Sequence, residues 1–370
     1  MKGFPSFGAK DRSALSRANM RAFATLLVVL FHLCLGVPVG IQTATPNNSS
    51  GNKSVHSLAW FERYHDYAAH LKYIHGLSQK HRSLSQTFLA GNSFEKRPIQ
   101  CIHAYGRSGP GLHPAIVFLG TVHAREWITT MVTEYIAFSL LEHYRHDSDV
   151  RHALDSFDFY IFPIVNPDGF IYSQTQDRMW RKNRQRQRGT TCVGRDLNRN
   201  WDVQWGMKGG AATAPCRSTY RGSKPLDAPE TRALAVELRA IKESQGVRLF
   251  IDWHAFGQLV MYPYGYSCEK KLPPFSAVRW LAGELAEAMG KVHGSRYRAG
   301  TACELLYPTS GDSADWAFDV LGADYAYTVE LRPGLRARAG FRLPESEILE
   351  TAEEAWAGVR HVLKFIRHPR

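Results

Sequence analysis

The sequence lacks the features that would divide it into parts or leave it unfolded. Between residues 57 and 370 it has no internal repeat and no Pro/Gly/Ser-rich break, and a long apolar run occurs only at residues 22–37. Although 370 residues would accommodate two domains, the absence of a break favours one compact domain. Charged residues make up only 22% of the chain and hydrophobic residues 44%, which excludes disorder for most of it.

The single long apolar run has the layout of a secretory signal peptide. Basic residues precede residues 22–37, and Pro38 and several small residues follow them. A membrane anchor, the alternative, needs ~20 apolar residues, and the run reaches that length only by including His32 and Pro38. We therefore expect a signal peptide over residues 1–44, a secreted, extracellular protein and no stable membrane association. Its basic segment is unusually long, and a start at Met20 would leave the first 19 residues untranslated.

Residues 45–56 are expected to form an exposed polar linker. Asn47, Asn48 and Asn52 each begin an Asn-x-Ser/Thr sequon, as in an exported glycoprotein. Of the six cysteines, Cys34 lies in the leader, which leaves five for the mature chain. Two disulfides and one free thiol are the simplest arrangement, and counting alone leaves the pairing open.

Positive charge exceeds negative charge along the chain. The formal net charge is +12, and residues 1–41 hold five basic residues and one acidic residue, so the rest carries +8. Apart from the run Arg181–Arg188, the basic residues are scattered, and a solvated loop accounts for that run without a ligand. A nucleic-acid or polyanion binder is a rival function. Because no aromatic-interleaved binding motif accompanies the charge, we expect no nucleic-acid partner.

Apolar strand-like runs alternate with helical patterns from residue 57 onward. The expected strands cover residues 99–105, 115–120, 157–165, 247–253, 259–264 and 325–331. The expected helices cover residues 57–78, 126–144, 229–243, 275–293, 312–321 and 345–366. Solid apolar strands separated by helices are typical of a sheet buried on both faces. The expected fold class is therefore α/β, one compact domain with a mixed, mostly parallel, twisted sheet covered by helices on both faces.

Two polar motifs at the ends of expected strands have the residue types of a zinc site. His123 and Glu126 follow the strand at 115–120, and His254 ends the strand at 247–253. A His-x-x-Glu pair alone is a weak signal, since such pairs occur by chance in any large protein. Two histidines and a glutamate at the carboxyl edge of a sheet, however, are the three-ligand set of a catalytic zinc with water in the fourth position.

Glu330 lies within a third apolar strand and is a candidate general base. A buried, unpaired carboxylate is costly, so it should be neutralised or act on something. Beside a zinc site it would take a proton from water and return it to the leaving amine. The alternative is a structural ion pair with Arg332 or Arg125.

These motifs follow one another in the order of a known family. The matching segments are His123-Ala-Arg-Glu126-Trp, Asn166-Pro-Asp-Gly169, Trp180-Arg-Lys-Asn-Arg184, Asp196-Leu-Asn-Arg-Asn-Trp201, His254, Tyr307 and Glu330-Leu-Arg332. In this order they resemble the pancreatic-type zinc metallocarboxypeptidases, the carboxypeptidase A/B or funnelin family, over residues 57–367. The resemblance implies a carboxypeptidase-like catalytic domain over residues 57–370 with one zinc ion per chain. It further implies a monomeric exopeptidase that removes single residues from the C-termini of peptides and proteins.

The resemblance also implies roles for particular residues. It assigns His123, Glu126 and His254 as zinc ligands, Glu330 as general acid/base and Arg181 as the arginine that stabilises the oxyanion. It assigns Asn198 and Arg199 as the pair that binds the substrate's C-terminal carboxylate, and Tyr307 as the side chain that closes over that carboxylate. Arg125 is assigned as a subsite arginine. These assignments make physical sense, since a guanidinium binds a carboxylate through two parallel hydrogen bonds. An arginine reserved for a terminal carboxylate makes an exopeptidase, because an internal peptide bond offers no charge there.

The resemblance places Ala314 at the floor of the pocket for the substrate's terminal side chain. A small uncharged floor predicts hydrophobic or aromatic specificity, of the carboxypeptidase A type. Other expected wall positions are Met261, Gly265, Leu306 and Thr328. Asp312 complicates this prediction: if its carboxylate reaches the pocket, terminal Lys or Arg would also be accepted, and if it points to solvent they would not.

The resemblance further implies disulfides Cys192–Cys216 and Cys268–Cys303, with Cys101 free. The sequence departs from the family pattern at Pro333-Gly334, where Asp-Thr-Gly is usual, and this puts the following loop in doubt. About a dozen residues separate the leader from the catalytic domain, where the family normally has an inhibitory prodomain. Either the enzyme is made without a zymogen stage or the gene model lacks that segment. A zinc-binding pseudo-carboxypeptidase is a further rival, but the chain keeps Glu330 and Arg199.

Overall fold

A computed structural model describes residues 57–367 of the chain. The predicted signal peptide, the polar linker and the three sequons lie outside the described residues. Within residues 57–367, no helix combines the length and the apolar character that crossing a bilayer requires.

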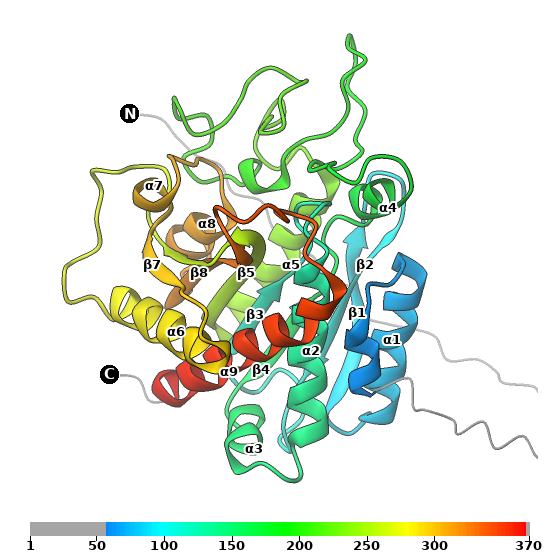
Figure 1. Ribbon diagram of the computed structural model, residues 1–370, viewed down its shortest axis with the longest axis vertical. Coiled ribbons are helices and arrows are strands. Elements are labelled where there is room, and N and C mark those ends of the chain that lie inside the picture. The colour runs from blue at the N-terminus through cyan, green and yellow to red at the C-terminus, as the bar shows by residue number, and fades with distance from the viewer. Residues whose placement is uncertain (1–56, 368–370) are drawn as a thin grey trace, which may run out of the picture. The chain divides into compact units, whose positions relative to one another are not determined.

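One mixed eight-stranded sheet is the centre of the described chain, in the order β1-β2-β4-β3-β5-β8-β6-β7 (Figure 1). Its strands are β1 Ser85–Asn92, β2 Pro98–Ala104, β3 Ala115–Leu119, β4 Asp158–Phe162, β5 Val247–Gly257, β6 Leu259–Tyr262, β7 Arg298–Thr301 and β8 Tyr325–Gly334. The central strands β4, β3, β5 and β8 run parallel. Antiparallel pairs join β1 to β2, β2 to β4 and β6 to β8. The predicted mixed, mostly parallel sheet is confirmed.

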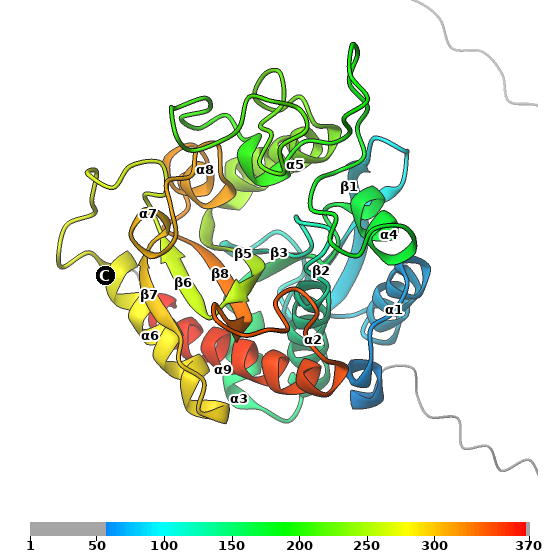
Figure 2. The same cartoon turned by 45° about the horizontal axis from the view of Figure 1, so that its top comes forward.

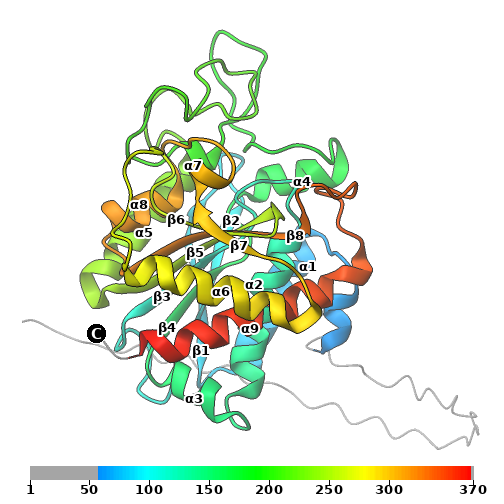
Figure 3. The same cartoon turned by 60° about the vertical axis from the view of Figure 1, so that its left-hand side comes forward.

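Helices cover both faces of this sheet, as Figure 2 shows. They are α1 Tyr67–Lys80, α2 Ile128–His143, α3 Ser148–Leu154, α4 Pro167–Thr175, α5 Pro229–Gln245, α6 Ala277–His293, α7 Ala302–Leu305, α8 Ser313–Asp319 and α9 Ile348–Ile366. Short 3-10 turns cover Leu58–Glu62, Leu197–Arg199 and Glu345–Glu347. Helices α1, α2, α6 and α9 pack on one face, with α6 and α9 side by side (Figure 3), and α5 and α8 pack on the other.

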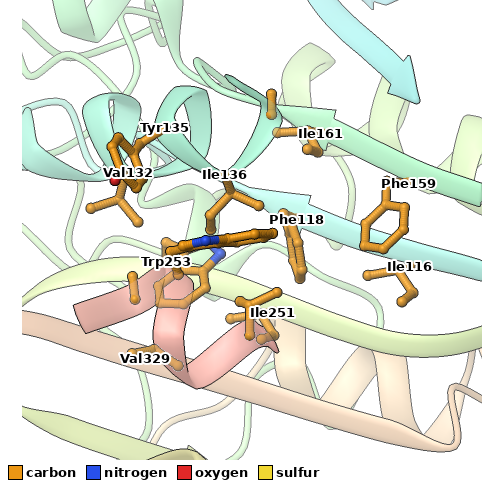
Figure 4. Packing of buried hydrophobic residues seen from close by; sticks show 14 of the residues in the cluster. Ile116, Phe118, Val132, Tyr135, Ile136, Phe159, Ile161, Ile251, Trp253 and Val329 are labelled. Atoms are coloured by element: carbon orange, nitrogen blue, oxygen red, sulfur yellow. The ribbon is translucent and has the colours of Figure 1, made fainter. Parts of the chain in front are cut away.

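The core follows from the alternation of side chains along the central strands. Phe118 of β3 and Ile251 and Trp253 of β5 point toward α2, where the rings of Phe118 and Trp253 meet edge to face (Figure 4). The intervening residues Val117 and Phe250 belong to the core cluster on the opposite face, beneath α5 and α8. This alternation decides which strand residues face the site described below.

Four predicted elements differ from the structure. The strand expected at 247–253 continues to Gly257, so His254 lies within β5 and not at its end. The helix expected at 57–78 is interrupted, because the backbone at Arg63 is extended and the Asp66 carboxylate accepts a hydrogen bond from Ala69 N–H, which begins α1 anew. The strand expected at 157–165 ends at Phe162, ahead of the N-cap of α4. Strand β8 continues through the departure at Pro333-Gly334, so this segment extends the strand.

Candidate active site

The parallel strands β3, β5 and β8 bring the predicted polar residues to one edge of the sheet. In the register of β5 and β8, His254 pairs with Glu330 and Asp252 pairs with Thr328. Because Trp253 points into the core beneath α2, its neighbours on the strand face the opposite side, toward α8. His254 and Glu330 are thereby neighbours through sheet geometry, 76 positions apart in the sequence.

The three predicted metal ligands converge. His123 follows β3, Glu126 precedes α2 and His254 lies on β5, and one ligand atom from each lies within 4.8 Å of the others. Glu126 Oε1 is 2.9 Å from His123 Nδ1, and its Oε2 is 2.9 Å from His254 Nδ1. All three side chains are buried. Two imidazoles and a carboxylate aimed at one point are the donor set that a catalytic zinc takes, with a further position left open.

Two buried aspartates that were not among the predicted site residues support the histidines. Asp196 Oδ1 lies 3.1 Å from His123 Nε2, and Asp252 Oδ2 lies 3.0 Å from His254 Nε2. A carboxylate behind a ligand histidine fixes its tautomer and raises its basicity. Burial opposes the charge of Asp196, but Arg181 and His123 outweigh it and hold the pKa of this carboxyl well below its ordinary value. An Asp two positions before a strand His, on the same face, was the signal for Asp252.

Asp196 also holds the arginine assigned to the oxyanion. Arg181 Nε and Nη2 each lie 2.9 Å from Asp196 Oδ2, and the arginine side chain is 11% exposed. One carboxylate thus contacts both a predicted metal-ligand histidine and a guanidinium.

The three residues assigned to the substrate carboxylate lie close together. Asn198 Oδ1 accepts a hydrogen bond from Ser313 N–H at 2.8 Å, which fixes the amide at the start of α8. Arg199 is 3% exposed, and its Nε has no hydrogen-bond partner among the described residues. Its guanidinium carbon lies 5.9 Å from the ring centroid of Tyr307, which is 47% exposed. A buried guanidinium with a free donor beside an exposed ring is suited to receiving an anionic group.

Asn198 and Arg199 belong to the long segment between α4 and α5, which a disulfide and a buried amide anchor. Cys192 and Cys216 are bonded, with their Cα atoms 5.0 Å apart. Asn200, fully buried, donates to the carbonyls of Arg221 and Lys224 and accepts from Ala228 N–H. The second disulfide joins Cys268 to Cys303, and Cys101 is free and buried in β2.

A cavity with about 520 Å³ of empty space, partly open to solvent, lies between these groups. Its lining includes every predicted site residue except Glu126 and Arg125: His123, Arg181, Asn198, Arg199, His254, Tyr307, Asp312, Ala314 and Glu330. The Glu126 carboxylate contacts the Nδ1 atoms of both histidines. The Arg125 guanidinium stacks 3.8 Å from the centroid of Phe341 and lines a neighbouring cavity, which shares Arg181 with the first.

Glu330 has none of the structural ion pairs considered as an alternative role. Arg332 bonds instead to Glu354 and Glu350 of α9, and the Arg125 guanidinium lies over Phe341. Glu330 Oε2 is buried without a hydrogen-bond partner in the described chain. Burial, together with the nearby Glu126 charge, raises the pKa of the Glu330 carboxyl to about 8. An unpaired carboxyl with a raised pKa beside a metal-ligand set is the environment of a proton carrier.

The expected specificity positions line the same cavity, and Asp312 is among them. Its side chain is buried; Oδ1 accepts from Asp315 N–H at 2.8 Å and Oδ2 from the Thr309 hydroxyl at 2.6 Å. A Cβ on Gly265 would lie 2.9 Å from Asp312 Oδ2, so this glycine leaves room for the carboxylate. Asp315 also lines the cavity; burial, and then the Asp312 charge, raises its pKa well above the ordinary value. Asp315 was not among the predicted site residues.

Comparison with known proteins gives consistent relationships. The zinc carboxypeptidase family (Peptidase_M14) matches residues 70–358. The chain is 43% identical over 338 residues to Metallocarboxypeptidase A of Arthroderma otae, covering 91% of this chain and 79% of that one. It is 37% identical to carboxypeptidase A2 of Rattus norvegicus, covering 84% and 72%. Bovine thrombin-activatable fibrinolysis inhibitor, solved with a tick carboxypeptidase inhibitor, superposes with a TM-score of 0.76 at 32% identity, covering 83% of this chain and 98% of that one.

Proposed function

The chain belongs to the zinc carboxypeptidase family, and from this premise we propose that it is a secreted monomer with its catalytic domain over residues 57–370. Its activity is that of a metallocarboxypeptidase of the A type, an exopeptidase. The observation that carries the assignment is the convergence of His123, Glu126 and His254 beside a cavity that Glu330 and Arg199 also line. Secretion is supported by the signal-like segment and by two disulfides, which persist in oxidising compartments.

We assign His123, Glu126 and His254 as the residues that hold one zinc ion. The donor set fits, because two imidazoles, a carboxylate and an open position are the protein share of a catalytic zinc site. The buried carboxylates of Asp196 and Asp252 stand behind the two histidines, as ligand histidines require. When bound, the zinc ion supplies Lewis-acid polarisation of the scissile carbonyl and lowers the pKa of water.

Arg199 and Asn198 bind the free carboxylate at the substrate's C-terminus. Arg199 is buried with a free Nε donor, and the adjacent Asn198 amide is held by Ser313. Because an internal residue of a peptide has no carboxylate at this position, binding here selects the last residue of the chain. Tyr307, exposed at the rim of the cavity, closes over the bound residue and excludes water.

Glu330 and Arg181 act on the scissile bond. Glu330 takes a proton from the attacking water and delivers it to the leaving nitrogen, so the carboxyl finishes in its starting state. Arg181 donates N–H groups to the carbonyl oxygen as negative charge develops there, and Asp196 keeps its guanidinium in place. The same side chain faces both the cavity for the terminal residue and the neighbouring cavity.

The terminal side chain enters a pocket floored by Ala314, with Met261, Leu306 and Thr328 in the lining. A small apolar floor favours Phe, Tyr, Leu or Met, since each buried methylene contributes about 0.8 kcal/mol. The enzyme therefore chiefly removes hydrophobic and aromatic residues from the C-termini of its substrates.

Mixed specificity is the second candidate, and the burial of Asp312 favours it. The carboxylate lines the pocket, and each oxygen keeps a lone pair beyond its single intramolecular hydrogen bond. A terminal Lys or Arg could therefore form an ion pair at this wall.

The experiment measures kcat/KM for zinc-loaded enzyme on peptides that differ only in their last residue, Phe or Arg. We expect Phe to be preferred, and Asp312→Asn to remove whatever Arg activity is present while keeping the N-cap of α8. Asp319→Asn, on the same helix but outside the cavity, is the matched control. A preference for Arg would overturn the apolar assignment, and no hydrolysis of any peptide would favour the pseudo-carboxypeptidase.

A further inference from the structure

The surplus positive charge of the described chain is concentrated in one segment. Residues 176–228, between α4 and α5, hold 12 Lys/Arg and four Asp, an excess of eight positive charges. The other described residues hold 27 Lys/Arg and 29 Asp/Glu, a slight negative excess. The charge is thus less scattered than the Arg181–Arg188 run alone indicated. Figure 1 shows this segment in green at the top of the view, beyond the carboxyl ends of the strands.

A second cavity opens within this segment and adjoins the active site. It contains about 850 Å³ of empty space, open to solvent, and shares Arg181 with the catalytic cavity. Its lining carries the basic side chains Arg125, Arg181, Lys182 and Arg184, against Asp177 as its one acidic residue. A concave surface with one sign of charge concentrates ligands of the opposite sign.

Arg184 is a basic side chain of this cavity whose guanidinium is free to bind, and Arg125 of the same lining also has no ion pair to a described side chain. The Arg184 guanidinium carbon lies 3.5 Å from the ring centroid of Tyr172 and 4.4 Å from that of Trp180. It has no hydrogen bond or ion pair to another described side chain, whereas Arg181 is paired with Asp196 and Lys182 donates to Pro215 O. Stacking fixes the plane of the guanidinium and leaves its N–H edge available to a carboxylate.

We propose that this second cavity is a subsite for an acidic side chain upstream of the substrate's terminal residue. The inference rests on the proposed function and deepens it. The terminal residue occupies the pocket floored by Ala314, and the scissile bond lies beside Arg181, so the chain on the N-terminal side of that bond leads past Arg181 into the second cavity. The preferred substrates are therefore peptides with Asp or Glu a few residues before the C-terminus.

The test uses peptides of one length with the same C-terminal residue and Glu, Gln or Lys at each of the second to fifth positions from the end. At one of these positions we expect kcat/KM to be about three- to tenfold higher for Glu than for Gln, and lowest for Lys. Arg184→Gln should remove most of the Glu-to-Lys ratio. Arg188→Gln, which removes the same charge from the same segment outside the cavity, should leave it unchanged.

Equal kcat/KM for the Glu and Lys peptides at every position would overturn the proposal. An equal fall of the Glu-to-Lys ratio of kcat/KM in Arg184→Gln and Arg188→Gln would also overturn it. That result would mean that the overall positive charge of the segment, and not Arg184 in the cavity, causes the preference. Peptide binding to Glu330→Gln, measured by calorimetry, separates this inference from the proposed function. Glu-dependent binding without hydrolysis by the wild-type enzyme would contradict the activity and support the subsite.

Discussion

Replacing Asp196 by Asn should disable two parts of the active site at once. Oδ1 of this carboxylate accepts from Asn198 N–H at 3.0 Å and lies 3.1 Å from His123 Nε2, while Oδ2 accepts from Arg181. An amide has one oxygen and one NH2 group, so in either orientation its NH2 group faces a donor. The substitution also removes the charge that compensates Arg181.

The expected magnitudes follow from these contacts. Loss of a carboxylate behind a ligand histidine typically weakens metal binding about 10- to 100-fold. Removing one partner of a buried ion pair costs about 3–5 kcal/mol, and Arg181 lines a solvent-accessible cavity, so we expect a loss of about 2–3 kcal/mol in the free energy of unfolding. A misplaced oxyanion arginine should lower kcat about 10²-fold.

Three measurements on purified Asp196→Asn check this prediction: zinc affinity by chelator competition, the free energy of unfolding in denaturant, and kcat on one peptide. Asp202→Asn is the matched control, since Asp202 lies in the same segment and pairs with Arg239 on the partly exposed surface. The control should lose at most about 1 kcal/mol of stability and bind zinc normally. Equal zinc affinity and kcat in Asp196→Asn and the wild type would refute the reasoning.

Four further predictions concern Glu330 and the cysteines. Glu330→Gln should retain zinc and fold while kcat falls at least about 10²-fold, and normal turnover would contradict its role as proton carrier. Glu330 acts when deprotonated, so activity should fall as pH decreases. Burial raises the pKa of Glu330 from 4.5 to about 8, and a bound cation would lower it again. We therefore expect the acid limb of the kcat/KM profile between pH 4.5 and about 8. A limb below pH 4.5 would argue against Glu330. The Cys192→Ser/Cys216→Ser protein should lose about 3 kcal/mol of stability, and Cys101 should react with maleimide only after unfolding.

The metal-ligand set could be predicted because it depends on where the apolar runs end, although β5 itself continues three residues beyond His254. His254 ends an apolar run and His123 follows another, and parallel strands bring their carboxyl ends to one edge whatever the loops do. The alternation of side chains along the strand also places Asp252 on the same face as His254, so its role beside His254 was predictable, although it was not predicted. Asp196 could not be placed in this way, because its contact with His123 depends on the path of the long segment after α4, which no strand periodicity describes.

The specificity pocket shows a similar limit. Sequence left open whether the Asp312 carboxylate faces the pocket or solvent. The structure places it in the lining because it caps α8 and accepts from Thr309, two local contacts that withdraw it from solvent. Strand β1 was missed because its Ser, Gln, Thr and Asn give no apolar run, although its pairing with β2 fixes it at the edge of the sheet.

We propose above all that Arg199 makes this enzyme select a free C-terminus, and that Glu330 acts on the adjacent bond beside the residues that would hold zinc. The most direct measurement is mass spectrometry of one peptide, supplied with a free or an amidated C-terminus, after incubation with purified enzyme with and without chelator. We predict stepwise loss of single C-terminal residues from the free peptide, abolished by the chelator, and no cleavage of the amide. Cleavage of the amidated peptide at a comparable rate, or products from internal bonds, would contradict the account.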